Sequence, residues 1–166
     1  MATKNLSQSE AIEKIKELAT SIDFALMASQ LSKLPLHTIP MSTKKVDSAG
    51  YIWFLSGKDS THNRHIQKDS KVQLFYAKAK AMEFMTVYGK AEIVEDQFII
   101  DELYQKTDDL WFDGKNDPNI SAIKVIPEDA HYWDSKDNRF VSLLKLGAAA
   151  VTGKKTELSE QGDLKL

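Results

Sequence analysis

Three hydroxyls and a histidine lie close together in the stretch WFLSGKDSTH, residues 53–62. Ser56, Ser60 and Thr61 carry the hydroxyls, and His62 follows them. The stretch begins like a buried strand and continues into a short helical segment, for which Ser60 is a suitable N-cap. The start of a helix offers free backbone N–H groups and the positive end of the helix dipole, and both favour a bound anion such as phosphate. His62 and Arg64 could add positive charge, although an ordinary helix cap is the simpler interpretation of the same residues.

Other kinds of catalytic site find no support in the residue types or their spacing. The chain has no cysteine, which removes disulfides, thiolate nucleophiles and zinc–cysteine sites. It contains neither a Walker loop nor a G-x-S-x-G nucleophile motif. His62 and His65 are three residues apart and could share a helix face, but no third metal ligand lies near them in the sequence. We therefore predict no metal site, and the sequence points to no catalytic residue.

Helices are expected where capping residues precede apolar residues at helical spacing. Ser7 and Glu10 form an S-x-x-E capping box, and the apolar residues that follow predict an amphipathic helix of about three turns. Two further helices are expected over residues 60–69 and 96–107, the second capped by Asp96.

Short strands account for most of the remaining chain, because apolar residues alternate or form short runs there. Gly89 lies within one such run and suggests a bend or a close backbone approach. Strands and helices do not alternate and no G-x-G-x-x-G motif occurs, so a Rossmann layout is disfavoured. The pattern predicts an α+β fold organised around a small antiparallel barrel with flanking helices. The expected strands cover residues 22–29, 34–43, 50–56, 71–77, 83–95, 120–127 and 130–135, and residues 139–153 are expected to form a strand that runs into a short helix.

Length and charge limit the class of protein. The 166 residues carry a formal net charge of −2, which favours neither a general nucleic-acid binder nor a membrane-surface protein. No apolar run approaches the ~20 residues of a membrane-spanning helix, and the first residues do not look like a signal peptide. We expect a soluble cytoplasmic protein with a single domain over residues 1–155. Residues 156–166 lack periodicity and are expected to form a loose C-terminal tail.

The order and spacing of seven segments, rather than any single motif, resemble a known family. The segments are IPM (39–41), GYIWFLSGKDST (50–61), VQLFYA (72–77), YGKAEIVED (88–96), LWFDGKNDPN (110–119), AHYWDS (130–135) and LGAAAVTGKK (146–155). From about Glu10 to Lys155 the chain resembles the FMN-binding split-barrel proteins related to pyridoxamine 5′-phosphate oxidase, and in particular the bacterial general stress proteins. The resemblance implies that the predicted barrel is a split β-barrel.

The resemblance also implies an FMN cofactor and a homodimer with two flavin clefts at its interface. Residues 39–41 would contact the isoalloxazine ring, residues 55–56 would lie beside it, and residues 60–62 would surround the phosphate. The protein would then be a flavoprotein, with a redox reaction on a small molecule during stress as its expected activity. The alternative is a non-catalytic dimeric binding module of the same fold with weak or lost flavin binding. The residues implied for the cofactor are Ile39, Pro40, Met41, Leu55, Ser56, Ser60, Thr61, His62, Arg64 and Trp111.

Two positions depart from the pattern of the family. Ile39 stands where the family usually has arginine, and His62 stands where it usually has lysine. Charge-assisted contacts to phosphate are roughly twice as strong as neutral ones, so losing two costs on the order of 2–4 kcal/mol. His62 replaces a cation only when protonated, and an ordinary pKa of about 6.5 leaves it mostly neutral at pH 7. Arg64 could compensate by turning inward. We expect weak or pH-dependent flavin binding.

Overall fold

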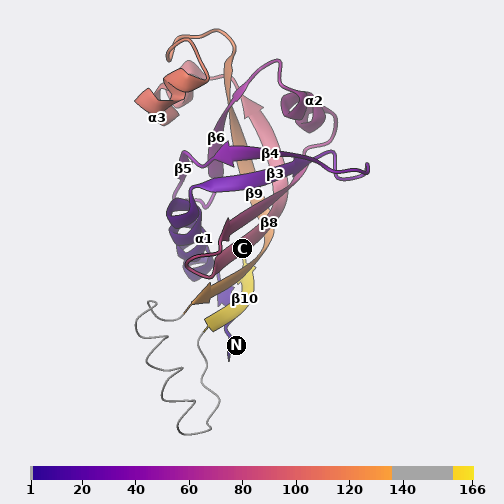
Figure 1. Cartoon of the computed structure of the whole chain (residues 1–166), viewed down its shortest axis with the longest axis vertical. Coiled ribbons are helices and arrows are strands. Elements are labelled where there is room, and N and C mark those ends of the chain that lie inside the picture. The colour runs from indigo at the N-terminus through magenta and orange to yellow at the C-terminus, as the bar shows by residue number, and fades with distance from the viewer. Residues whose placement is uncertain (1, 136–158) are drawn as a thin grey trace, which may run out of the picture.

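The computed structural model of the chain describes residues 2–135 and 159–166, which form a mixed sheet flanked by short helices (Figure 1). The helices are α1 Ser9–Ile22, α2 Thr61–Lys68, α3 Gln97–Leu103 and the 3-10 helix η1 Lys106–Leu110. The strands are β1 Ala2–Thr3, β2 Leu6–Ser7, β3 Phe24–Ser29, β4 His37–Ser42, β5 Lys45–Val46, β6 Ile52–Gly57, β7 Lys71–Lys78, β8 Glu83–Val94, β9 Ile120–Ser135 and β10 Ser159–Lys165.

The sheet bends round without closing, which gives an α+β split barrel as predicted. Its main order is β1-β10-β9-β8-β7-β3-β4, while β6 pairs with β9 and β5 with β6. The predicted strands 120–127 and 130–135 are one strand, β9, because β8 pairs with both halves of it. On its other side β9 pairs first with β6 and then with β10.

Alternation of side chains places the core on one face of the bent sheet. In β7, Val72, Leu74 and Tyr76 are buried, whereas Phe75 between them is exposed, as the period-2 pattern predicts. Helix α1 covers this inner face, with Ile15 and Leu18 buried in the core.

Gly89 marks a bend in the sheet, as its sequence position suggests. The β8–β9 register shifts between Tyr88 and Gly89. A Cβ atom at position 89 would lie 2.2 Å from the carbonyl oxygen of Ile126, so only glycine allows the two backbones to approach this closely.

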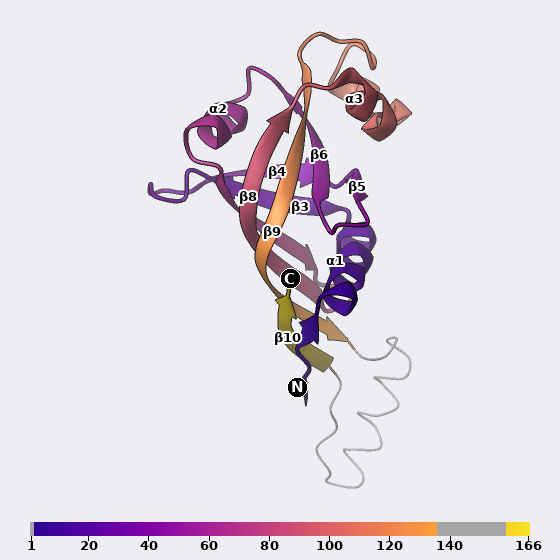
Figure 2. The ribbon, with the colours of Figure 1, turned by 180° about the vertical axis from the view of Figure 1, so that it is seen from behind.

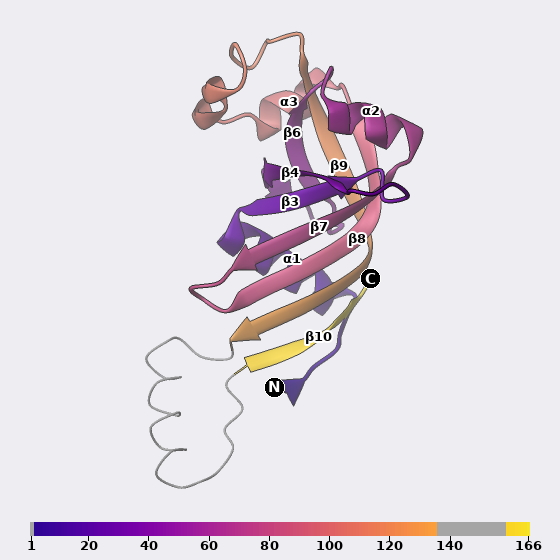
Figure 3. The same cartoon turned by 45° about the vertical axis from the view of Figure 1, so that its right-hand side comes forward.

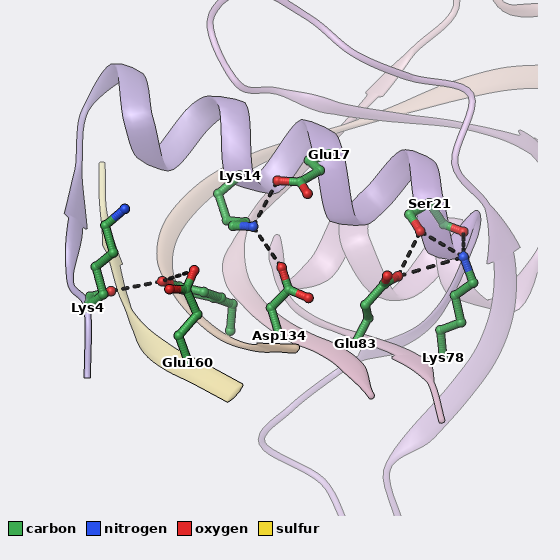
Figure 4. Close-up of polar contacts among 9 residues, drawn as sticks. Lys4, Lys14, Glu17, Ser21, Lys78, Glu83, Asp134 and Glu160 are labelled. Carbon is green, nitrogen blue, oxygen red and sulfur yellow. Dashed lines mark hydrogen bonds and ion pairs between the residues drawn. The ribbon is translucent and has the colours of Figure 1, made fainter. Parts of the chain in front are cut away.

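The start of α1 differs from the prediction. Ser7 does not cap the helix; it lies in β2, where it pairs with Lys165 of β10, and Gln8 occupies the N-cap position without a side-chain bond. Ser7 cannot both pair in a strand and cap α1, and it pairs because β10 lies beside it. Polar contacts instead fasten α1 to the sheet: Lys14 Nζ bonds the Asp134 carboxylate at 2.8 Å, as Figure 4 shows.

The end of the chain also differs from the prediction. Residues 159–165 of the expected loose tail form β10, which pairs with β9 and, in parallel, with β1 and β2. The two ends of the chain therefore meet at one end of the molecule (Figure 2). The strand and helix expected over 139–153, and the matching segment 146–155, lie outside the described residues.

The outer face of β3, β7 and β8 carries no helix within the described residues, whereas α3 packs against β6 and β9. Figure 3 shows β3, β7, β8 and β9 side by side, with α1 behind them. No helix of the described residues is long and apolar enough to cross a membrane.

Candidate functional site

The corner between β6 and α2 has the geometry expected for an anion site. β6 ends at Gly57 and α2 begins at Thr61, with Ser60 as the N-cap between them. The Ser60 hydroxyl accepts a hydrogen bond from the backbone N–H of Asn63 at 3.2 Å, which confirms the predicted cap. The positive end of α2 therefore lies beside the end of a strand.

A closed ring of hydrogen bonds supports this corner from inside. Ser56 Oγ donates to Asn63 Oδ1 at 2.8 Å, Asn63 Nδ2 donates to Ser121 Oγ at 2.9 Å, and Ser121 Oγ donates to the Ser56 carbonyl at 3.1 Å. All three side chains are buried. Because the Ser56 hydroxyl has one proton and gives it to Asn63, His62 Nε2 at 2.6 Å must be the donor in their contact. His62 therefore donates from Nε2 toward the protein, and in its neutral form its Nδ1 is an acceptor.

Histidines from α2 and β4 meet at the same corner. Ser29 of β3 and His37 of β4 face each other across the sheet. His65 Nδ1 lies 3.0 Å from Ser29 Oγ, and the His65 ring meets the His37 ring edge-on with centroids 5.0 Å apart. Within the described structure the buried His37 Nδ1 has no hydrogen-bond partner. The sequence singled out the spacing of His62 and His65 but not His37, which only the fold brings to them.

Burial, and then the neighbouring histidines, lower the pKa of His62 and of His65. Burial, followed by the proximity of His37 and His65, lowers the pKa of His62 to about 4. Burial and the proximity of His37, with smaller effects from nearby lysines and Arg64, also lower the pKa of His65. Without a ligand, His62 is therefore neutral at pH 7. An ordinary pKa of about 6.5 would leave a small fraction of the side chain protonated at this pH.

Arg64 adds a permanent charge at the start of α2. Its guanidinium donates to the carbonyl of Asp59 and, at 3.0 Å, to Thr61 Oγ1, and the side chain stays exposed. A cation at this end adds to the positive end of the helix dipole, so both attract an anion. The inward turn considered from the sequence does not occur in this structure.

The predicted ring-contact segment lies on an edge strand. Met41 is buried and Ile39 is half-buried against the core, whereas Pro40 is exposed. β4 ends the strand order, so its outer edge is not paired with any strand of the described residues. β4 contacts β6, where Leu55 is buried in a second apolar cluster. The side chains of Ile39 and Met41 pack toward the core, so the backbone edge of the segment is the part that is free to contact a ligand.

Trp111 belongs to a different region of the chain. It follows η1, and 80% of its surface is exposed. A buried ion pair between Lys44 and Asp108 fixes η1, and Asp108 also accepts from the backbone N–H of Gln105 at 2.8 Å. Five of the predicted site residues lie together at the β6–α2 corner: Ser56, Ser60, Thr61, His62 and Arg64. Within the single chain, Trp111 is exposed to solvent instead.

Comparison with known proteins assigns the family. The model of the family described as "Pyridoxamine 5′-phosphate oxidase like" matches residues 10–157, which are most of the chain. The chain belongs to this family. General stress protein 26 of Bacillus subtilis is 33% identical over 60 residues, which span 36% of this chain and 43% of that relative.

Solved structures agree on the fold. A general stress protein 26 from Jannaschia sp. CCS1 superposes with a TM-score of 0.79 at 19% identity, covering 96% of this chain and 100% of that one. A general stress FMN/FAD binding protein from Xanthomonas citri superposes with a TM-score of 0.66 at 22% identity, covering 79% and 93% respectively. The described residues contain no group of three or more side chains arranged to hold a metal ion.

Proposed function

We propose that this family member binds FMN at the β6–α2 corner and works as a flavoprotein. The observation that carries the proposal is the start of α2, where the helix dipole, the Ser60 cap and the Arg64 guanidinium gather beside a strand end. The name of the Xanthomonas citri protein, which includes FMN/FAD binding, supports the same ligand.

The residues present suit this cofactor. The buried His37 Nδ1 lacks a partner within the described residues and could meet a polar group of a ligand, because buried polar atoms are nearly always satisfied. The edge of β4 at Ile39–Met41, which no strand in the described part of the chain pairs, offers backbone groups to a flat polar ring, with Leu55 and Ser56 on the strand that β4 contacts. Thr61 and Ser60 would face the phosphate, and Trp111 would cover the flavin of a partner subunit.

Bound FMN would supply the redox chemistry, while the chain supplies position and electrostatics. The activity that we propose is oxidation or reduction of a small molecule, in the cytoplasm and as a component of a stress response. Neutral His62 and apolar Ile39, in place of two cations, specifically favour the alternative of a non-catalytic binding module with weak flavin affinity.

A homodimer belongs to the proposal, and the open sheet face supports it. Apolar side chains point outward in two rows across five strands, Pro40–Leu26–Phe75 and Ala77–Phe84–Trp133, which we call the outer rows. Leu26 is 50% exposed and Phe24 beside it 57%. A hollow of about 440 Å³ lies along the second row, away from the β6–α2 corner. Burying an apolar face of this extent against a second copy of the chain is more favourable than leaving it exposed to water.

The test is the visible absorption spectrum of the purified protein, before and after addition of FMN and desalting. We expect FMN to bind in titration, with more of the flavin spectrum retained after desalting at pH 6 than at pH 8. We also expect anaerobic transfer of electrons from the reduced, loaded protein to a quinone to be faster than from free reduced FMN. A colourless protein that shows no FMN fluorescence quenching in titration would overturn flavin binding. Retained flavin without faster transfer would favour the non-catalytic module.

A further inference from the structure

Three of the four histidines of the chain gather at the β6–α2 corner. His37 comes from β4, and His62 and His65 come from successive turns of α2; we call them the histidine cluster. The fourth, His131, lies elsewhere on β9, where its Nδ1 is 2.7 Å from an Asp163 carboxylate oxygen. Separate elements therefore bring the cluster together, and one of its members lacks a partner among the described residues.

Among the described residues, the charged groups that act on His62 and His65 are all basic. His65 is influenced by His37, Lys68, Arg64 and Lys33, in that order, and His62 by His37 and His65. The other elements that contact the cluster contribute neutral hydroxyls, from Ser29 on β3 and Ser56 on β6. Two carboxylates lie at the ends of α2, Asp59 and Asp69, and Asp69 accepts a hydrogen bond from the backbone N–H of Lys71. Neither carboxylate contributes to the lowered pKa of His62 or His65. Without a ligand, like charges and burial oppose protonation.

We propose that the histidine cluster binds the phosphate of FMN in its protonated form, so that flavin binding takes up protons and selects FMN over riboflavin. The inference rests on the proposed function and adds to it how this chain replaces the missing cations. A phosphate dianion beside the imidazoles reverses the balance, because an opposite charge at 4–6 Å favours the charged form of each ring. The proton comes from the buffer and forms an N–H bond at the free imidazole nitrogen, and no other covalent bond changes.

The direction of the pH dependence follows from this linkage. Histidines that are neutral in the free protein and protonated in the complex bind protons on association. For each linked proton, FMN affinity falls by up to about tenfold per pH unit between the pKa of the free protein and that of the complex. Affinity therefore decreases from pH 6 to pH 8, whereas riboflavin, which lacks phosphate, shows no such decrease.

Isothermal titration calorimetry of the full chain tests the proposal. FMN and riboflavin are titrated at pH 7.5 in two buffers with different ionisation enthalpies, because the FMN phosphate, with a second pKa of about 6, is then almost fully a dianion. We expect uptake of roughly 0.5–1 proton per FMN and close to none per riboflavin. FMN binding without proton uptake would overturn this inference and leave the proposed function standing. If neither flavin binds, both are overturned.

Variants assign the protons to residues. His62→Lys replaces a titrating group by a permanent cation, so proton uptake should fall and FMN affinity at pH 8 should rise by about tenfold. His65→Gln should lower uptake and affinity together. His131→Gln, remote from the cluster, is the matched control and should change neither. Unaltered proton uptake in both cluster variants would overturn the assignment, and the buffer comparison on the unmodified chain does not depend on any variant folding.

Discussion

At the scale of single residues, His62 links the corner to acid stability. Its pKa is about 4 in the folded protein and about 6.5 in an unfolded chain, so the unfolded state binds the extra proton. The stabilisation is complete above pH 6.5 and is lost as the pH falls toward 4, by on the order of 1–3 kcal/mol for a half-buried group. The free energy of unfolding of His62→Gln, from urea titrations at pH 7 and pH 4.5, should drop less than that of the unmodified protein. The His131→Gln control should drop as much as the unmodified protein; parallel losses in all three would contradict the shifted pKa.

Residues whose partners are near in sequence could be predicted, and those with distant partners could not. The Ser60 cap was predictable because its acceptor and donor are three residues apart, and Asp96 caps α3 in the same way. The buried ring through Asn63 depends on Ser121, 58 residues away, and no local pattern reveals that pair. His37 joins the histidine cluster only because the β3–β4 hairpin turns it toward α2.

At the scale of elements, alternating strands were predictable and polar edge segments were not. Alternation in β7 and β8 follows directly from having one face in the core and one outside. β10 has few apolar residues, and backbone pairing with β9, β1 and β2 holds it, with Leu164 buried. Backbone pairing requires no particular side chains, so a sequence pattern does not reveal it. The predictions of a loose tail and of a Ser7 cap on α1 were wrong for this reason. The resemblance to a family added the expectations of an FMN cofactor and of a homodimer, which strand patterns cannot supply.

The bend of the sheet depends on one glycine. Gly89→Ala places a methyl group 2.2 Å from the Ile126 carbonyl, so β8 and β9 must separate, and we expect a loss of about 2–3 kcal/mol or more in the free energy of unfolding. Urea unfolding followed by circular dichroism measures it. Gly57→Ala is the matched control, because its added Cβ would lie 3.4 Å from the Asn119 side chain, and it should cost less than about 1 kcal/mol. Equal stability of the two variants would show that the backbones do not approach this closely.

At the scale of the whole molecule, the outer rows should decide whether the corner can hold a flavin. A stable homodimer usually buries roughly 800 Å² per subunit around an apolar centre, and Leu26 and Phe75 lie opposite each other in the middle of the exposed face. Leu26→Asp places a charge there, and we expect the dissociation constant of the proposed dimer to rise at least a hundredfold. Leu34→Asp, at a side chain that is 87% exposed in the β3–β4 loop, should leave the dimer intact.

Sedimentation velocity at micromolar concentration gives the oligomeric state, and FMN titration of the same samples gives its consequence. If the flavin lies between subunits, monomeric Leu26→Asp should lose FMN affinity although the histidine cluster is unchanged, because it would lose the contact that we propose between exposed Trp111 and the flavin of the partner subunit. A monomeric variant with undiminished FMN affinity would place the whole binding site within one chain. An unmodified protein that sediments as a monomer would leave the outer rows without the occupant that we propose. Dissociation and loss of flavin together would show that the corner supplies the charge and the dimer supplies the enclosure.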